Sequence, residues 1–217
     1  MSILLNLLHQ NERLIEAKLG KPLHNLRILE IGPGQGLERA RYFGLQNDVD
    51  AIDLDVIPTN PGTRVYLDMI KRNGYGRFAK TVGRRLIIGR ANETAWAKVV
   101  GADQFRDPQM IYGDICQDAP QVEGYDLVVS WSVFEHLPNP QQALANIIRT
   151  LKPGGVFFIS LHLFTSINGS HDIRAFTGQE DKTPLWGHIG QSTRHLITPS
   201  SFRMNGVSLN GGICFLK

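Results

Sequence analysis

A glycine-rich loop constrains this chain more than any other feature. The apolar run Arg27–Ile31 suits a short buried strand, and Gly32, Gly34 and Gly36 follow it directly, with the acidic Glu30 just ahead. Glycines there let the backbone turn tightly and let a ligand approach without meeting a Cβ. A following helix would present free N–H groups to a ligand anion. The spacing G-x-G-x-G departs from the G-x-G-x-x-G of dinucleotide-binding loops, so it disfavours NAD or FAD.

Apolar runs alternate with helical patterns up to about residue 161. Expected strands cover residues 27–31, 49–53, 109–112, 126–131 and 156–161, and expected helices cover residues 4–19, 35–43 and 140–151. Strands that alternate with helices predict an α/β fold with a doubly wound, mostly parallel sheet. Ligands of such sheets bind at the carboxyl ends of the strands, where the motifs of this chain lie.

The clearest helix follows residue 139. Asn139 can cap it and Pro140 suits its first position. Its predicted buried stripe consists of Leu144, Ile147, Ile148 and Leu151. The run Lys152–Gly155 is expected to end it with a turn.

An acidic residue closes the second expected strand. Asp53 lies 21 residues after Gly32, and a carboxylate there can accept hydrogen bonds from two ribose hydroxyls. Asp55 lies two residues further on and points to the same side of an extended chain, so it is an alternative to Asp53, though a less favoured one. The competing interpretation is a loop whose glycines only make a turn, and the acid at this spacing weakens it.

Four motifs stand in order at the ends of successive expected strands. They read LEIGPGQG, AIDLD, YGDI and YDLVVSWSVFEHLPNPQQALANIIRTLKPGG. With them, residues from about Arg27 to Leu161 resemble class I S-adenosylmethionine-dependent methyltransferases of the small-molecule, ubiquinone/menaquinone-type branch. The resemblance implies a Rossmann-like fold and S-adenosylmethionine as cofactor, and it leaves the acceptor open.

The resemblance also implies roles by position. The expected cofactor-binding residues are Glu30, Gly32, Gly34, Gly36, Asp53, Leu54, Asp114, Ile115, Ser130 and Trp131. The glycine loop would hold the methionine part and Asp53 the ribose. Asp114 would accept a hydrogen bond from the adenine amino group, and Ile115 would offer its backbone N–H. Ser130 and Trp131 would lie beside the methionine end.

Three histidines are candidates for a general base: His136, His162 and His171. Each could take a proton near neutral pH, which is needed only if the acceptor must lose one. The alternative for each is a local hydrogen-bonding role. Glu135, which with His136 resembles the family's EH pair, is expected to be structural. Cys116 is expected to line the site, because no basic partner adjoins it.

Residues 60–106 depart from the family pattern. The family usually joins its second and third strands by one short helix, but 55 residues separate Asp53 from Gln109 here. Residues 60–106 hold ten Lys and Arg against three Asp and Glu, a charge of +7 in a chain of net +3. One hypothesis is a helical cap over the acceptor side that attracts an anionic acceptor. The alternative is a solvated surface insert.

The segment 165–217 is also atypical. It is rich in Gly, Ser, Thr, Asn and His, and the family's last strands cannot be placed in it. Residues 206–217 are either one edge strand or a poorly ordered end. Trp186, His188 and His195 are candidate walls of an acceptor pocket. The expected organisation is therefore one domain over residues 1–217, with an insert at 60–106.

Composition excludes several classes. Two cysteines outside any CxxC pattern exclude a zinc ribbon or disulfide framework, and they fit a reducing, cytoplasmic location. The N-terminus lacks the pattern of a signal peptide, and no run of 18 apolar residues predicts a membrane span. No cluster of Asp, Asn and His predicts a metal site. The N-terminal helix is expected to close the cofactor site.

The favoured function is therefore methyl transfer from S-adenosylmethionine to an oxygen or nitrogen of a small acceptor, with an anionic acceptor suggested by the basic insert. The alternatives are a non-catalytic binding subunit with this fold, transfer of another group such as aminopropyl, and a nucleic-acid methyltransferase. Nucleic acid is disfavoured because the basic stretch has few aromatic residues for base stacking. A homodimer is left open.

Overall fold

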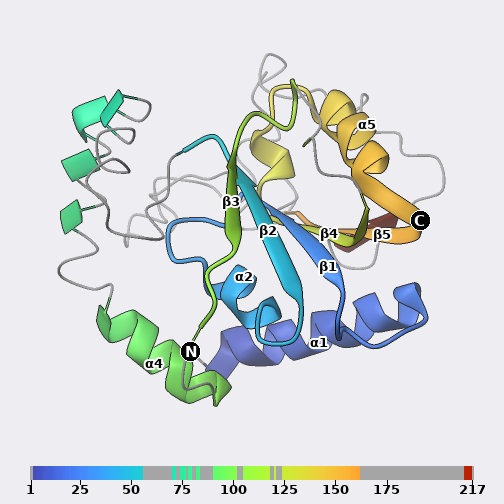
Figure 1. Ribbon diagram of the computed structural model, residues 1–217, viewed down its shortest axis with the longest axis horizontal. Helices are drawn as coiled ribbons and strands as arrows, with labels where there is room; N and C mark the ends of the chain where they lie inside the picture. The colour runs from blue at the N-terminus through green and yellow to red at the C-terminus, as the bar shows by residue number, and fades with distance from the viewer. Residues whose placement is uncertain are drawn as a thin grey trace, which may run out of the picture.

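A mostly parallel sheet forms the centre of the computed structural model (Figure 1). The structure describes residues 2–55, 90–101, 105–117, 120, 124–161 and 213–216, with short helical pieces at 70–71, 74–76, 78–79 and 82–83. The strands are β1 (Arg27–Ile31), β2 (Asp48–Asp53), β3 (Gln109–Tyr112), β4 (Tyr125–Trp131), β5 (Leu151–Ser160) and β6 (Ile213–Leu216). Their order is β3-β2-β1-β4-β5-β6, and only the β5–β6 pair is antiparallel among them.

Helices cover both faces of the sheet. They are α1 (Ser2–Leu19), α2 (Glu38–Phe43), α4 (Arg90–Val100) and α5 (Pro140–Thr150), with a 3₁₀ turn η2 (Phe134–His136). Helices α1, α2 and α4 lie on one side and α5 lies on the other (Figure 1). This arrangement confirms the doubly wound α/β fold. No helix in the described part of the chain is long and apolar enough to cross a membrane.

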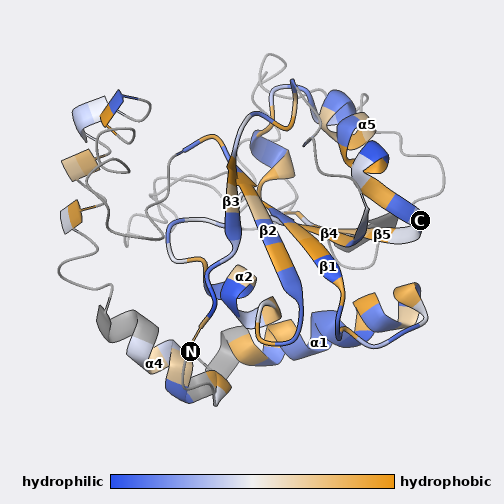
Figure 2. Ribbon diagram, in the orientation of Figure 1, coloured by the Kyte–Doolittle hydropathy of each residue, from blue (hydrophilic) through white to orange (hydrophobic). Residues whose placement is uncertain are grey.

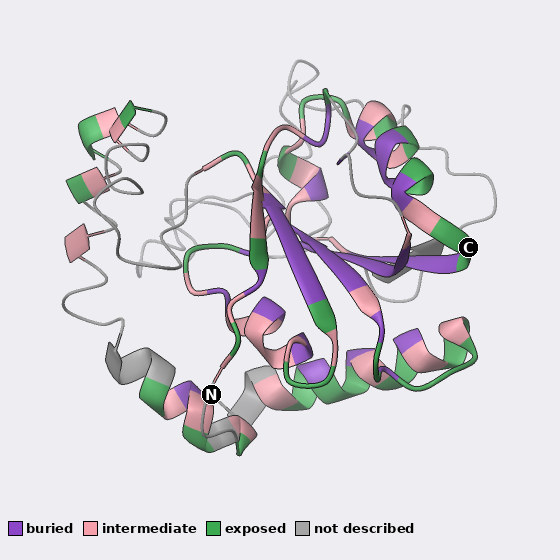
Figure 3. Cartoon of the chain, viewed as in Figure 1, coloured by how far each residue is buried: buried purple, intermediate pink, exposed green. Residues whose placement is uncertain are grey.

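The strands are apolar on both faces because successive side chains enter two different core layers. On β4, Leu127 and Val129 pack with α1 and α2, whereas Val128 packs with α5. Every residue of β4 is buried, and the inner strands carry many hydrophobic residues (Figure 2) and are largely buried (Figure 3). This double-sided burial explains why the strands read as continuous apolar runs.

Helix α5 starts as expected but presents a different face. Asn139 Oδ1 accepts a hydrogen bond from the Gln142 N–H at 3.1 Å, and Pro140 is the first helical residue. The prediction that Ile148 belongs to the buried stripe is wrong, since this side chain is 55% exposed. The helix instead buries Ala143, Asn146, Ile147 and Thr150. These positions follow the helical period, and Ile148 lies about 100° further round the axis.

The run Lys152–Gly155 does not form a separate turn. Strand β5 already begins at Leu151, which pairs with Tyr125, and the next paired residues are Leu127 and Val156. The run between them bulges from the strand, with Gly154 at φ +79°. The glycine therefore serves a bulge at the start of β5.

Helix α4 lies within the 60–106 stretch and belongs to the core. Its Trp96 is 2% exposed and donates a hydrogen bond from Nε1 to the Glu38 carbonyl of α2 at 3.1 Å. The remainder of the basic insert stays a prediction. Residues 162–212 lie outside the described residues, and so do the candidate wall residues Trp186, His188 and His195. Strand β6 confirms an edge strand within 206–217.

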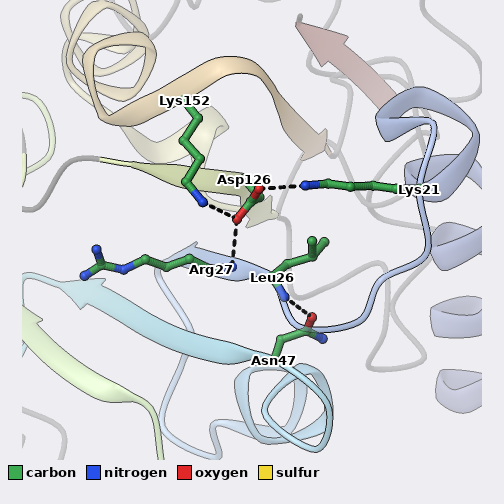
Figure 4. A network of polar contacts seen from close by, with 6 residues as sticks. All are labelled: Lys21, Leu26, Arg27, Asn47, Asp126 and Lys152. Carbon is green, nitrogen blue, oxygen red and sulfur yellow. Dashed lines mark hydrogen bonds and ion pairs between the residues drawn. The ribbon is translucent and has the colours of Figure 1, made fainter.

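A polar network joins the amino ends of the central strands (Figure 4). Asp126 of β4 accepts hydrogen bonds from Lys21 Nζ at 2.7 Å, Lys152 Nζ at 2.8 Å and the Arg27 N–H at 3.0 Å. This carboxylate thus ties β4 to β1 and to the segment after α1. The network lies at the edge of the sheet opposite the glycine loop.

Candidate functional site

The predicted cofactor-binding residues gather at one edge of the sheet. Ile31 pairs with both Ile52 and Ser130, and Asp53 pairs with Tyr112, so four parallel strands end at nearly the same level. The loops that follow β3, β2, β1 and β4 therefore leave the sheet side by side in that order. Every residue proposed from the sequence as a cofactor contact lies at one of these strand ends.

The glycine loop is held tightly on one side and is open on the other. The Gly32 N–H donates to the Ile52 carbonyl at 2.9 Å, and Gly32 has a φ of +63°. A Cβ on Gly32 would lie 2.6 Å from Cγ2 of Val133, in the loop after β4. Gly34, at φ +70°, has no atom of the described residues within 4 Å of its Cβ position. The backbone at Gly34 is therefore accessible to a ligand.

The loop continues to Leu37, so helix α2 starts three residues later than expected. Leu37 has a φ of +56°, and α2 begins at Glu38 instead of residue 35. Arg41 of α2 anchors the loop, because its guanidinium donates to the Gly36 carbonyl at 3.4 Å and to Asp107 Oδ1 at 2.7 Å. This arginine links the glycine loop to the segment that precedes β3.

Asp53 is half-buried at the end of β2. Its Oδ1 accepts a hydrogen bond from the Asp55 N–H at 2.8 Å, and its carbonyl accepts one from the Gly113 N–H at 3.1 Å. Asp55 thus helps to orient the Asp53 carboxylate through its backbone. Leu54 is 63% exposed between them.

Asp114 is half-buried in the loop after β3. Its Oδ1 accepts from the Cys116 N–H at 2.8 Å and its Oδ2 from Gln117 Nε2 at 3.0 Å. The carbonyl of the buried Ile115 accepts from Asn146 Nδ2 of α5 at 2.8 Å. Burial raises the pKa of the Cys116 thiol, which fits a lining role better than a nucleophilic one.

Three buried polar side chains near the loop have atoms with no hydrogen-bond partner among the described residues. They are Glu30, through both carboxylate oxygens, Ser130, through Oγ, and Trp131, through Nε1. Burial raises the pKa of Glu30 to about 8, with the charge of Arg39 opposing this shift and that of Glu38 adding to it. Such groups are costly in a folded chain, so they point to a place where a ligand binds.

The structure describes one of the three candidate bases, His136. The side chain of His136 is exposed at the end of η2, and its backbone N–H donates to the Val133 carbonyl at 2.9 Å. Glu135 beside it is half-buried. His162 and His171 lie outside the described residues. Within the part of the chain that the structure describes, no group of three or more His, Cys, Asp and Glu side chains is placed to hold a metal ion.

Sequence reasoning missed three residues of this site. Val133 fills the space beside Gly32, Arg39 places its guanidinium 5.2 Å from the ring centroid of Trp131, and Asn146 holds the loop after β3. Asn146 left a signal, because it is a polar residue on the apolar face of an amphipathic helix. Val133 and Arg39 left none, because each contacts a residue from a distant part of the sequence that only the folded chain brings near.

The geometry can be set beside known proteins. Residues 5–204 match the model of a family described as a methyltransferase domain. The arsenite methyltransferase of Mus musculus is 26% identical over 168 residues, which cover 76% of this chain and 36% of that protein. The chain thus spans little more than a third of the length of this relative.

Solved structures give weaker likenesses. A TehB-like SAM-dependent methyltransferase from Corynebacterium glutamicum has a TM-score of 0.39 and 24% identity, over 68% of this chain and 59% of its own. The plantazolicin methyltransferase BpumL, in complex with SAH, has a TM-score of 0.44 and 17% identity, over 76% and 48%. With TM-scores below 0.5, these likenesses add nothing to the assignment. The family model, which covers most of the chain, carries it: the chain belongs to the methyltransferase domain family, in the S-adenosylmethionine-dependent class I group that its motifs resemble.

Proposed function

We propose that this chain binds S-adenosylmethionine along the carboxyl edge of β1–β4 and transfers its methyl group to an oxygen or nitrogen of a small acceptor. The observation that carries the proposal is the spatial order of the groups. Asp114, Asp53 and Gly34 follow adjacent strands β3, β2 and β1. Strands lie about 4.8 Å apart, so the ends of β3 to β4 extend over about 14 Å. An extended nucleoside joined to an amino acid would present its base, sugar and amino-acid end in that order.

The residues at this edge fit such a molecule. A carboxylate has about four acceptor positions, so the backbone bonds to Asp53 and Asp114 leave capacity for ribose hydroxyls and an adenine amino group. The accessible side of Gly34 would admit the amino-acid end. An ammonium beside the buried Glu30 carboxylate would compensate for the cost of ionising it there.

The remaining residues would position the cofactor and shield it from water. The Ile115 N–H would donate to the purine ring, Ser130 and Trp131 would offer their unpaired donors near the methionine end, and Leu54 would cover the ribose. When bound, the cofactor supplies a methyl group that its sulfonium has already activated. The chain then has to align the acceptor and exclude water, and alignment alone contributes up to about 7–11 kcal/mol. Where the acceptor must lose a proton, His136, His162 and His171 are the proposed bases.

A binding comparison tests the cofactor half of the proposal. Calorimetric titration with S-adenosylhomocysteine should give a clear binding isotherm for the wild type. Asp53→Ala should weaken it about tenfold or more, since charge-assisted hydrogen bonds to the ribose are lost. Asp48→Ala is the matched control, because Asp48 is an exposed carboxylate at the opposite end of the same strand. Equal affinities for all three proteins would refute the site.

Turnover tests the other half. Methyl transfer from labelled S-adenosylmethionine should be measured on a panel of small O- and N-acceptors, with arsenite included because the mouse relative is named for it. Binding without turnover on any acceptor would favour a non-catalytic binding subunit. Transfer to nucleic acid alone would replace the small acceptor in the proposal.

The acceptor is proposed to be anionic because residues 60–106 carry a charge of +7. Arg84→Ala combined with Arg85→Ala should raise the KM for an anionic acceptor and leave cofactor affinity nearly unchanged. Arg13→Ala combined with Lys18→Ala removes the same charge from exposed positions of α1 and should leave that KM unchanged. An equal loss of acceptor and cofactor binding in the first variant would contradict the steering role.

A cytoplasmic location and a homodimer stay predictions.

A further inference from the structure

Asn146 is a fully buried polar residue in an otherwise apolar layer. It lies on the inner face of α5 with an exposed fraction of 0%, between Ala143 and Ile147, which pack against the sheet. Burying a side-chain amide costs free energy unless its donors and acceptor are hydrogen-bonded. Its contacts therefore show what the residue does in the fold.

The amide of Asn146 is oriented by two neighbours on its own helix. Gln142 Nε2 donates to Asn146 Oδ1 at 3.0 Å, and the guanidinium of Arg149 donates to the same oxygen. Because both bonds hold the oxygen, the amide nitrogen is directed away from the helix. That nitrogen donates to the Ile115 carbonyl at 2.8 Å, across 31 residues of sequence.

The bond reaches the peptide group that joins Ile115 and Cys116, and this group is held from both ends. Its carbonyl accepts from Asn146, and its N–H, that of Cys116, donates to Asp114 Oδ1 at 2.8 Å. A planar peptide group transmits orientation from one end to the other. The position of the Asn146 amide therefore affects how the Asp114 carboxylate is directed.

We infer that Asn146 is a positioning residue that sets the purine specificity of the site through the 115–116 peptide and Asp114. The inference rests on the proposed function, in which Asp114 accepts a hydrogen bond from the amino group of adenine. Asn146 would act through its hydrogen bond to the Ile115 carbonyl and not through contact with the purine. Its effect is on the discrimination between an amino group and a carbonyl at that position of the purine.

The test compares S-adenosylhomocysteine with S-inosylhomocysteine, which carries a carbonyl in place of the adenine amino group. Wild type should bind the adenosyl compound at least about tenfold more tightly, since a site built to pair with a polar group rejects an analogue that lacks it. The ratio to compare is the dissociation constant of the inosyl compound divided by that of the adenosyl compound. Asn146→Leu should lower this ratio to about three or less. A ratio does not depend on the fraction of protein that is folded, so a purely structural loss would leave it unchanged.

Thr150→Val is the matched control. Thr150 is equally buried on the same face of α5, and its hydroxyl donates only within the helix, to the Ile147 carbonyl at 2.8 Å. This variant should lose stability and keep the wild-type ratio. If Asn146→Leu does not fold, Gln142→Ala loosens the same amide from a half-buried position and should lower the ratio in the same direction.

The outcomes separate this inference from the proposed function. If wild type binds neither compound, the proposed function fails. If wild type discriminates and the Asn146 and Gln142 variants discriminate equally well, the inference is overturned and the cofactor site stands. If wild type binds both compounds equally, Asp114 does not read the amino group and the inference is likewise overturned.

Discussion

The Cα of Gly32 and the side chain of Val133 are so close that a Cβ on the glycine would lie 2.6 Å from Val133 Cγ2. Gly32 directly follows β1 and Val133 belongs to the loop after β4, so the contact joins the loops that follow these two neighbouring strands. The residue at position 32 must therefore be small for two reasons, the neighbouring valine and the positive φ of +63°.

Gly32→Ala should lower the free energy of unfolding by about 2–4 kcal/mol, because left-handed backbone strain and overpacking add. Adding Val133→Ala should recover the overpacking part and leave the strain. Urea denaturation of wild type, both single variants and the double variant gives the coupling energy. Strictly additive effects would show that the two residues do not meet.

Gly34→Ala should affect binding more than stability. In the part of the chain that the structure describes, no atom lies within 4 Å of its Cβ position, so the φ of +70° is the expected source of cost, about 1–2 kcal/mol. A methyl group on the accessible side of the loop should reduce affinity for S-adenosylhomocysteine about tenfold or more. Gly20→Ala is the control, since Gly20 has a φ of +73° and equally open surroundings at the end of α1. The space beside Gly34 is not a ligand site if both variants bind alike.

Glu30 predicts an unusual dependence of stability on pH. Burial raises its pKa from 4.5 to about 8, so the folded state holds this proton more tightly than the unfolded state does. Stability is therefore highest below pH 4.5 as far as this group is concerned, and it is lost as the pH rises through about 8. A tenfold difference in proton affinity between the two states corresponds to about 1.4 kcal/mol, so the effect amounts to a few kcal/mol.

Glu30→Gln should flatten that fall between pH 5 and 8, and denaturant unfolding at several pH values measures it. Asp48→Asn is a suitable control, because Asp48 is an exposed carboxylate at the amino end of β2, away from Glu30. If the free energies of unfolding of wild type and Glu30→Gln change in parallel with pH, Glu30 does not titrate in this range. A cationic ligand beside Glu30 should also release a proton on binding near pH 7, which calorimetry in two buffers detects.

The fold could be predicted because its strands are buried on both sides. Ile28 and Leu29 enter opposite layers, so the run is apolar at most positions, with Arg27 and Glu30 as its polar residues, and β4 is likewise mostly apolar. The strand ends then followed from the glycines and acids that interrupt the runs. For that reason the expected strand edges agree with the structure to within one residue for β1 to β4.

The helix faces could be predicted less well. A stripe drawn through the largest apolar residues of 140–151 included Ile148, but the helix turns Asn146 and Thr150 inward instead. Asn146 stands among the apolar residues of the helical pattern, but the sequence does not reveal its partner, the Ile115 carbonyl 31 residues away. The hydrophobic pattern of a sequence indicates which residues are buried, but it does not indicate which residues form hydrogen bonds with one another.

The candidate site was predictable only one residue at a time. Glu30 and Asp53 stood out as carboxylates at strand ends, and Asp114 was assigned through the resemblance to the methyltransferase family. Their spatial order depends on β1 lying between β2 and β4, which the sequence order does not reveal. Contacts between elements that are distant in the sequence, such as Arg39 of α2 against Trp131 of β4, depend on that order and had no local signal.

Asp126 should stabilise the fold without affecting cofactor binding. Burial alone would raise the pKa of this carboxyl group, but hydrogen bonds from Lys152, Lys21 and the Arg27 N–H outweigh burial and hold its pKa well below the ordinary range. A lowered pKa means that the charged form stabilises the folded state. This stabilisation is complete above the ordinary aspartate pKa of about 4 and is lost as the pH falls through the lower folded value.

Asp126→Asn should therefore reduce the free energy of unfolding by about 1–3 kcal/mol at pH 7, since the lysines are half-exposed and the aspartate is not. The difference from wild type should shrink below pH 4. Asp48→Asn, which breaks an exposed 3.7 Å pair with Arg106, should change stability by less than about 0.5 kcal/mol. Both variants should bind S-adenosylhomocysteine as wild type does, because both carboxylates lie at the amino ends of their strands. A weaker affinity in Asp126→Asn would mean that the two edges of the sheet are coupled.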